Sequence, residues 1–393
     1  MSFKPRLTAP AALALAAVAL AAIGNPAMAQ TTPIKVGLML PSTGTFAALG
    51  DAIEKGFKLH VQEQGGKLGG REVQYFKVDD ESDPAKATDN VNKLIKRDQV
   101  DVLVGSVHSG VALAMARAAR DSNTLLIVPN AGADAITGAQ CAPNIFRSSF
   151  SNWQPGYAAG VVAAGKGYKR AMSITWNYAA GNEAVKGFAE GFEKGGGKLM
   201  KELSLPFPGV EFQALLTEIA AQKPDVVFAF FAGGGAVKFV KDYDAAGLKQ
   251  NVPLVVSGFV TDGTLQAQGA SAQGILSTLH YADNLDTPRN NAFRKAYAMT
   301  WKLQPDVYAV QGYDAAQMLS AGLNAVKGDM KQREALQAAI AKAVIDSPRG
   351  KFSLSPQRNP VQDIFLREAK GVNNEYRGIA VKALADPGRG CKI

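Results

Sequence analysis

Residues 34–45, IKVGLMLPSTGT, carry the strongest fold signal in the chain. The run 34–40 is apolar and rich in branched side chains, and prolines stand on both sides of it. Such a run is typical of a strand buried in a parallel sheet. Small polar residues follow it and lead into a helical pattern over about 46–64. The stretch therefore predicts the strand, loop and helix that open an α/β fold.

The alternation of strand and helix continues through residues 72–128 and begins again at residue 170. This order predicts parallel sheets with helices on both faces. No linker is long enough to separate independent domains, so we expect two α/β lobes that meet at a cleft. Toward the end of the sequence, the predicted helices and short strands no longer follow this alternation, which suggests that the chain crosses back between the lobes.

The first residues have the order of a secretory signal peptide. Lys4 and Arg6 precede a 13-residue apolar run, residues 11–23, and Ala27-Met28-Ala29 forms a small-x-small cleavage site. The run is shorter than the roughly 20 residues that a membrane span needs. We expect cleavage after Ala29 and an exported, periplasmic chain of residues 30–393 without stable membrane insertion.

The basic balance of the sequence does not indicate nucleic-acid binding. The formal charge is +9, from 43 basic and 34 acidic residues. Basic and acidic residues alternate at helical spacing, as in Glu183–Lys186, which favours a solvated surface over a nucleic-acid site. A mild attraction for small anions is the more useful interpretation.

Composition and motifs give no sign of an enzyme, a metal or a cofactor. Two cysteines and three isolated histidines make a zinc site improbable. Residues 160–167 resemble a phosphate loop, but Gly167 stands where a Ser or Thr must hold magnesium. In an exported chain, Cys141 and Cys391 favour one disulfide, and two unpaired thiols are the alternative.

Two strand-to-helix loops are candidates for a binding site, because ligands of parallel sheets bind at the carboxyl ends of strands. They are residues 105–110, with His108 and Ser109, and residues 130–134. Small residues and free N–H groups at a helix start favour an anion such as a carboxylate. Ordinary short turns are the alternative, as is a neutral His108 that is hydrogen-bonded within its loop. Trp176, Tyr178 and Phe259 could sandwich a ring at the cleft or pack in the core.

The order of several short motifs resembles the solute-binding receptors of ABC importers, and most of all the branched-chain amino-acid (Leu/Ile/Val) receptor type. The motifs are Ile34-Lys35-Val36-Gly37, Pro41-Ser42-Thr43-Gly44, Gly69-Gly70-Arg71, Asp79-Asp80, Asp83-Pro84, Val104-Gly105, Ile145-Phe146-Arg147 and Gly312-Tyr313-Asp314-Ala315. Each motif is weak alone, and their order along the chain is specific.

The resemblance implies the type I periplasmic binding fold, in which two Rossmann-like lobes joined by three hinge crossovers close on a ligand like a Venus flytrap. Transferred to this chain, lobe one is residues 31–149 and 280–352. Lobe two is residues 150–279 and 353–393.

The resemblance also implies ligand-binding residues. In the amino-acid receptors a serine and backbone N–H groups hold the ligand carboxylate, and these positions match Ser109 and the segment Asn130-Ala131-Gly132. An acidic residue in lobe two usually balances the ammonium group, yet Phe259 stands near that position here. A shifted alignment would let Asp262 serve instead. Ser42, His108, Trp176 and Tyr178 complete the expected ligand-binding set.

An aromatic residue in place of the acid resembles the subgroup that binds aromatic carboxylates such as benzoate and phenylpropenoate derivatives. We therefore expect a monomeric, non-enzymatic receptor that captures an aromatic acid and delivers it to an ABC permease in the inner membrane. A receptor for branched-chain or other amino acids, a periplasmic ligand sensor and a periplasmic hydrolase are the alternatives.

Overall fold

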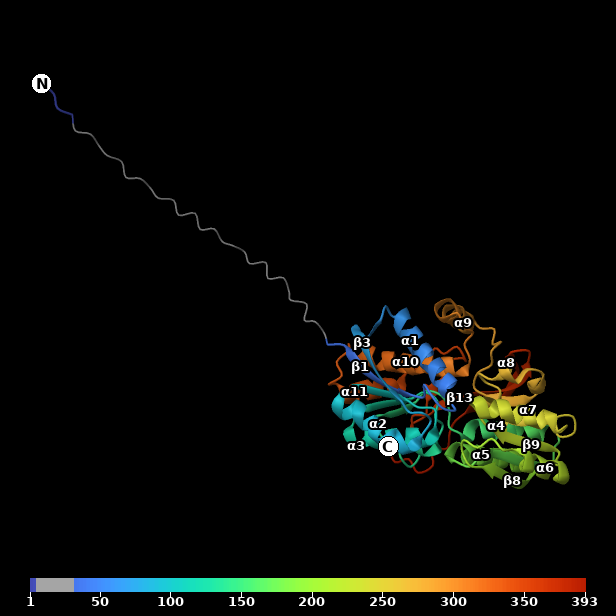
Figure 1. Ribbon diagram of the computed structural model, residues 1–393. Helices are drawn as coiled ribbons and strands as arrows, with labels where there is room; N and C mark the ends of the chain where they lie inside the picture. The colour runs from blue at the N-terminus through green and yellow to red at the C-terminus, as the bar shows by residue number, and fades with distance from the viewer. Residues whose placement is uncertain (5–31) are drawn as a thin grey trace. The chain divides into compact units, whose positions relative to one another are not determined.

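The computed structural model describes residues 1–4 and 32–393, and the predicted signal peptide with its cleavage site falls mainly outside the described residues. The unit Pro33–Ile393 holds the helices and strands that follow, in two α/β lobes that together contain three sheets (Figure 1). No helix of the described residues combines the length and apolar character that a membrane crossing requires.

The first sheet has the strand order β2-β3-β1-β4-β5-β6. Its strands β1, β3, β4, β5 and β6 are parallel, and β2 forms an antiparallel hairpin with β3. The strands are β1 (Ile34–Leu40), β2 (Lys67–Leu68), β3 (Arg71–Asp79), β4 (Val102–Gly105), β5 (Leu125–Val128) and β6 (Ile145–Arg147). As predicted, the run 34–40 is a buried strand, and it lies in the middle of this sheet.

Helices cover both faces of the first sheet. α1 (Ala47–Glu63) and α10 (Val307–Ala325) lie on one face, and α2 (Ala87–Asn92) and α3 (Ser109–Ser122) lie on the other (Figure 1). A Cβ atom on Gly56 of α1 would lie 1.9 Å from the carbonyl oxygen of Ala309 in α10. The two helices can therefore pack this closely only because residue 56 has no side chain.

The second lobe contains a parallel part, β8-β7-β9, and a mixed part, β10-β11-β13 with β12 and β14. A parallel bridge between Val227 and Leu254 connects the two parts. The strands are β7 (Arg170–Trp176), β8 (Lys198–Leu205), β9 (Val226–Phe230), β10 (Val255–Ser257), β11 (Leu276–Leu279), β12 (Ser353–Leu354), β13 (Pro360–Lys370) and β14 (Asn373–Leu384). The remaining helices are α4 (Trp153–Gly165), α5 (Ala179–Lys194), α6 (Gln213–Gln222), α7 (Gly233–Ala245), α8 (Leu265–Gln268), α9 (Pro288–Trp301) and α11 (Arg333–Lys342).

The end of the chain departs from the expected parallel order. β13 pairs antiparallel with β11, and β14 pairs antiparallel with β13 in a long hairpin. The C-terminal tail beyond β14 is held by a disulfide between Cys141 and Cys391, whose Cα atoms lie 5.5 Å apart. The predicted bridge is therefore present, and it fixes the end of the chain to the loop that follows β5.

Candidate functional site

Several helices begin around one small buried cavity. The volume of the cavity is about 20 Å³. Ser109 is the first residue of α3, Asn152 and Tyr178 precede the first residues of α4 and α5, and Ala232 precedes that of α7. α3 follows β4 of the first sheet, whereas α5 and α7 follow β7 and β9 of the other parallel sheet. Loops at the carboxyl ends of strands from two sheets therefore meet at the cavity.

The electrostatic character of the cavity comes from the backbone, since none of its fourteen lining residues is charged. Each helix start presents unpaired N–H groups and about half a positive charge. The lining residues are Phe46, Leu49, Val107, Ser109, Asn130, Gly132, Phe150, Asn152, Tyr178, Ala180, Phe230, Ala232, Phe259 and Tyr308. Such a cavity favours an anion without a fixed counter-ion.

Polar groups gather around Ser109. Its Oγ accepts a hydrogen bond from Nδ2 of Asn152 at 3.3 Å, which leaves the Ser109 hydroxyl hydrogen free to donate. The carbonyl of Gly132 accepts from the amide of Asn152 at 2.7 Å. The amide of Gly132 itself has no acceptor in the part of the chain that the structure describes. Both donors thus belong to residues of the cavity lining, and a carboxylate has two oxygens to accept from them.

Aromatic rings form most of the remaining wall. The ring centroids of Phe150 and Phe259 lie 4.6 Å apart, and Phe230 packs edge-on against Phe259 at 6.2 Å. Tyr308 lies beside Phe259 and is fully buried, yet its hydroxyl has no hydrogen-bond partner among the described residues. Burial and the nearby carboxylates Asp262 and Asp306 raise the pKa of Tyr308, so the hydroxyl stays protonated.

The structure brings five of the nine predicted ligand-binding residues to this cavity: Ser109, Asn130, Gly132, Tyr178 and Phe259. These residues differ in whether their polar groups are free to bind a ligand. The side-chain amide of Asn130 is already committed, because its Nδ2 donates to Oε1 of Gln311 at 2.7 Å.

His108 lies just behind the lining and stacks on Tyr178 with ring centroids 4.8 Å apart. Its Nδ1 accepts a hydrogen bond from the amide of Gly110 at 3.0 Å. Burial lowers the pKa of His108 to about 4, so the ring is neutral near pH 7. The geometry is that of a neutral histidine held within its own loop.

Ala131, Trp176 and Ser42 do not line the cavity. The amide of Ala131 donates to the carbonyl of Ser106. The indole of Trp176 is buried and donates to the carbonyl of Gly209 at 2.8 Å. Ser42 is exposed, and its amide donates to the Asp79 carboxylate at 2.9 Å.

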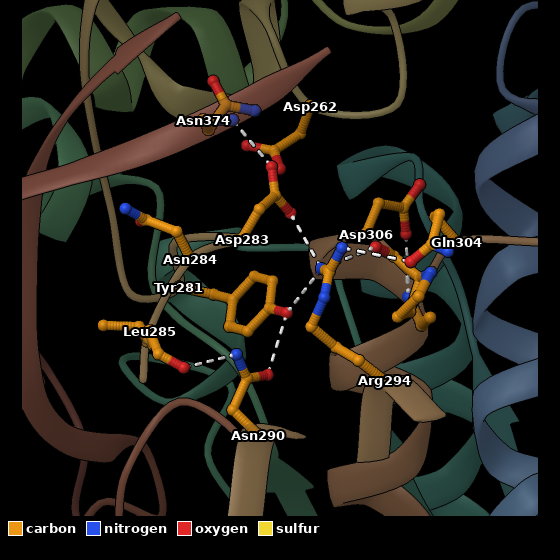
Figure 2. A network of polar contacts seen from close by, with 12 residues as sticks. Asp262, Tyr281, Asp283, Asn284, Leu285, Asn290, Arg294, Gln304, Asp306 and Asn374 are labelled. Atoms are coloured by element: carbon orange, nitrogen blue, oxygen red, sulfur yellow. Dashed lines mark hydrogen bonds and ion pairs between the residues drawn. The ribbon is translucent and has the colours of Figure 1, made fainter. Parts of the chain in front are cut away.

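Asp262, the candidate partner for a ligand ammonium group, is occupied elsewhere. Its carboxylate is buried and accepts from the guanidinium of Arg367 at 2.7 Å. Figure 2 shows Asp262 beside Asp283, in a polar network that includes Arg294. Arg294 contacts Asp283 at 3.6 Å and donates to the hydroxyl of Tyr281 at 3.3 Å. This network is separate from the cavity lining.

Phe46, Phe150, Asn152, Phe230 and Tyr308 also line the cavity and were not singled out from the sequence as ligand contacts. Position relative to secondary structure could have indicated two of them. Asn152 follows the strand-like residues 145–147, and Tyr308 follows Asp306, whose carboxylate caps α10 by accepting from Ala309 at 3.0 Å. No group of three or more metal-ligating side chains occurs within residues 32–393.

Comparison with known proteins places this geometry among transport proteins. Residues 33–374 match the periplasmic binding protein family. A "Leu/Ile/Val-binding protein homolog 6" of Brucella melitensis is 30% identical over 369 residues, which cover 90% of this chain and 93% of the homologue.

Two solved structures are similar over nearly their whole length. A solute-binding protein of an ABC transporter from R. palustris, in complex with benzoate, is 52% identical with a TM-score of 0.90. The match covers 92% of this chain and 100% of that one. A solute-binding protein from Rhodopseudomonas palustris BisB5, in complex with 3,4-dihydroxy benzoic acid, is 30% identical with a TM-score of 0.85 and covers 91% and 99% of the two chains.

Proposed function

Because the chain belongs to the periplasmic binding protein family, we propose that it is the receptor of an ABC importer and captures an aromatic carboxylate between its lobes. The single observation that carries this proposal is the cavity: it is walled by aromatic rings, contains no charged side chain, and has paired donors at Ser109 and Gly132. The benzoate and dihydroxybenzoate complexes of similar receptors support the same ligand class.

In this proposal the ligand carboxylate accepts hydrogen bonds from the Ser109 hydroxyl and the Gly132 amide. The starts of α3, α5 and α7 stabilise its charge. The ring lies against Tyr178 and Phe259 and replaces water in an apolar space. An amino acid fits less well, because its ammonium group would meet no acidic side chain in the lining.

The proposal also covers the export of the protein and the way it delivers its ligand. Cleavage after Ala29 releases a monomeric receptor into the periplasm. There the lobes, residues 31–149 with 280–352 and residues 150–279 with 353–393, close on the ligand by hinge motion and present it to the permease in the inner membrane. The receptor does not alter the ligand chemically.

Titration calorimetry on residues 30–393 tests the ligand class. We expect benzoate and 4-hydroxybenzoate to bind and to raise the melting temperature, because a ligand of the native state stabilises it by mass action. Leucine and valine should produce neither effect. Binding of leucine or valine alone would contradict the proposal and favour the amino-acid alternative.

A gene deletion separates the importer from a ligand sensor. If the protein is an importer receptor, its loss abolishes uptake of labelled benzoate at low concentration, and re-expression restores the uptake. Uptake that is unchanged while a transcriptional response to benzoate disappears would support the sensor instead.

A further inference from the structure

A buried carboxylate stands directly behind the proposed ligand donors. Glu183 lies on α5, and its Oε2 accepts a hydrogen bond from Nδ2 of Asn152 at 2.8 Å. The same Asn152 nitrogen donates to Oγ of Ser109 at 3.3 Å. Glu183 is therefore separated from the ligand-binding hydroxyl by a single side chain, although it does not line the cavity.

A second acidic residue, Asp134, contacts Glu183 through its backbone. The amide of Asp134 donates to the same Oε2 of Glu183 at 3.0 Å, and Oδ1 of Asp134 accepts from the amide of Trp153 at 3.3 Å. Asp134 begins a short turn after β5, whereas Glu183 belongs to a helix that packs on β7 to β9. The two acids thus connect an element of the six-stranded sheet with a helix that packs on the three-stranded sheet.

The charges that face this pair do not neutralise it. The groups with electrostatic influence on it are Arg147 on β6, Asp386 in the C-terminal tail and Tyr178 before α5. The guanidinium of Arg147 is held by the carbonyl of Ala133 at 2.9 Å and by Oδ1 of Asn359 at 2.7 Å. One guanidinium therefore faces three carboxyl groups in a buried space.

Resting on the proposed function, we propose that the buried pair Asp134 and Glu183 holds one proton when the ligand is bound, so that capture of a carboxylate takes up a proton from the solvent. An ionised pair would place negative charge next to the Ser109 site and oppose a second carboxylate there. A proton on one carboxyl oxygen, supplied by the buffer, removes that repulsion. Glu183 is then a positioning residue, because it acts on the ligand through Asn152 and Ser109.

The pKa values of Asp134 and Glu183 support this proposal. Burial and, to a lesser extent, the neighbouring carboxyl of Glu183 raise the pKa of Asp134 to about 8. Burial likewise raises the pKa of Glu183. When the lobes open, α5 separates from the turn at Asp134, both acids are hydrated, and their pKa values return toward about 4. The bound state therefore holds the proton more tightly than the free state.

The sign of the pH dependence follows from this difference. The affinity for a carboxylate is highest at low pH, falls between the free pKa near 4 and the bound pKa near 8, and levels off above it. Within that window the dissociation constant rises by at most about tenfold per pH unit for one proton. For benzoate we expect the dissociation constant to increase about 100-fold between pH 5.5 and pH 8.

Calorimetry with benzoate at pH 7, in buffers of different ionisation enthalpy, measures the proton uptake directly. We expect close to one proton per benzoate for the native sequence. Glu183→Gln keeps a side-chain acceptor but is neutral at every pH, so it should bind benzoate with a weaker pH dependence and with less proton uptake than the native sequence. Asp134→Asn should likewise weaken the pH dependence and reduce the proton uptake, and it provides a second test if the first variant does not fold.

Glu190→Gln is the matched control, because Glu190 lies on the same helix and contacts Trp153 and Arg389 instead of the Ser109 cluster. Its pH profile should follow that of the native sequence. Benzoate binding without proton uptake, or an unchanged profile in Glu183→Gln, would overturn this inference and leave the proposed function intact. If no aromatic carboxylate binds at any pH, the proposed function itself is wrong.

Discussion

The carbonyl oxygen of Gly132 accepts a hydrogen bond from the amide of Asn152 at 2.7 Å, and this contact holds the loop after β5 against the start of α4. No side chain fits at position 132. A Cβ atom there would lie 2.3 Å from Oδ1 of Asn152 and 2.8 Å from its backbone nitrogen. The proposed carboxylate donor, the Gly132 amide, is therefore positioned by close backbone packing.

Gly132→Ala should disturb this packing and the proposed site together. We expect benzoate affinity to fall by more than about tenfold, because the amide and Asn152 must move, and stability to fall by about 1–3 kcal/mol from overpacking. Calorimetry and urea unfolding measure the two effects. Gly165→Ala is the control, since a Cβ at Gly165 would contact nothing within 4 Å. Native-like affinity in Gly132→Ala would remove this loop from the site.

Ser109→Ala tests the second donor. The Ser109 hydroxyl is buried, and a hydrogen bond to a charged acceptor contributes about 1.5–3 kcal/mol, so benzoate affinity should fall roughly 10- to 100-fold. Ser122→Ala at the end of the same helix, whose hydroxyl donates to the carbonyl of Ala118, should leave affinity unchanged. Equal affinities for the native protein and Ser109→Ala would exclude Ser109 from the carboxylate site.

The sequence predicts the α/β fold well because buried parallel strands are short apolar runs, as in residues 34–40, with helical patterns between them. β14 was not predicted, because it is a partly exposed strand that contains Glu375, Arg377 and Lys382. Hydrogen bonding to β13 stabilises β14 as a strand, although the composition of β14 does not indicate one.

Only some of the residues that line the cavity were predicted, for a similar reason. Ser109 and Gly132 follow neighbouring strands of the first sheet, so the topology of a parallel sheet brings these two together. Phe259 also follows a predicted strand directly, but that strand belongs to another sheet. Asn152 contacts Ser109 across 43 residues of sequence, and Glu183 contacts Asn152 across 31. Those contacts depend on how separate elements pack. Trp176 was expected at the cleft, but it packs under Gly235, where a Cβ would lie 2.2 Å from its indole ring.

Tyr308→Phe should stabilise the protein. The Tyr308 hydroxyl is buried without a partner, and an unsatisfied buried hydroxyl costs about 1–3 kcal/mol. Removing it should raise the free energy of unfolding by about 1 kcal/mol and leave benzoate affinity the same or tighter. Tyr243→Phe is the opposite case, because the Tyr243 hydroxyl donates to the carbonyl of Val252 at 2.9 Å. We expect that variant to lose about 1 kcal/mol in the same urea titration. Destabilisation of both variants would show that Tyr308 has a partner in solution.

Removal of the disulfide should destabilise the chain without unfolding it. The bridge joins residues 250 positions apart, and a disulfide of this kind typically contributes about 2–4 kcal/mol. The Cys141→Ser, Cys391→Ser double variant should therefore melt at a lower temperature than the native protein. A thiol reductant should lower the melting temperature of the native protein and leave that of the double variant unchanged. Insensitivity of the native protein to a reductant that demonstrably frees both thiols would contradict this prediction.

Asp262 distinguishes the two ligand classes most directly, because it is the acid that would have to bind an amino-acid ammonium group. Its carboxylate pairs with Arg367 in a fully buried site, so Asp262→Asn leaves a buried guanidinium without its counter-ion. We expect a loss of about 3–5 kcal/mol in stability, and recovery of much of it when Arg367→Met is added. Neither change should alter the preference for benzoate over leucine, since Asp262 lies outside the cavity lining. Leucine binding in the native protein that disappears in the stable double variant would instead assign Asp262 to the ligand.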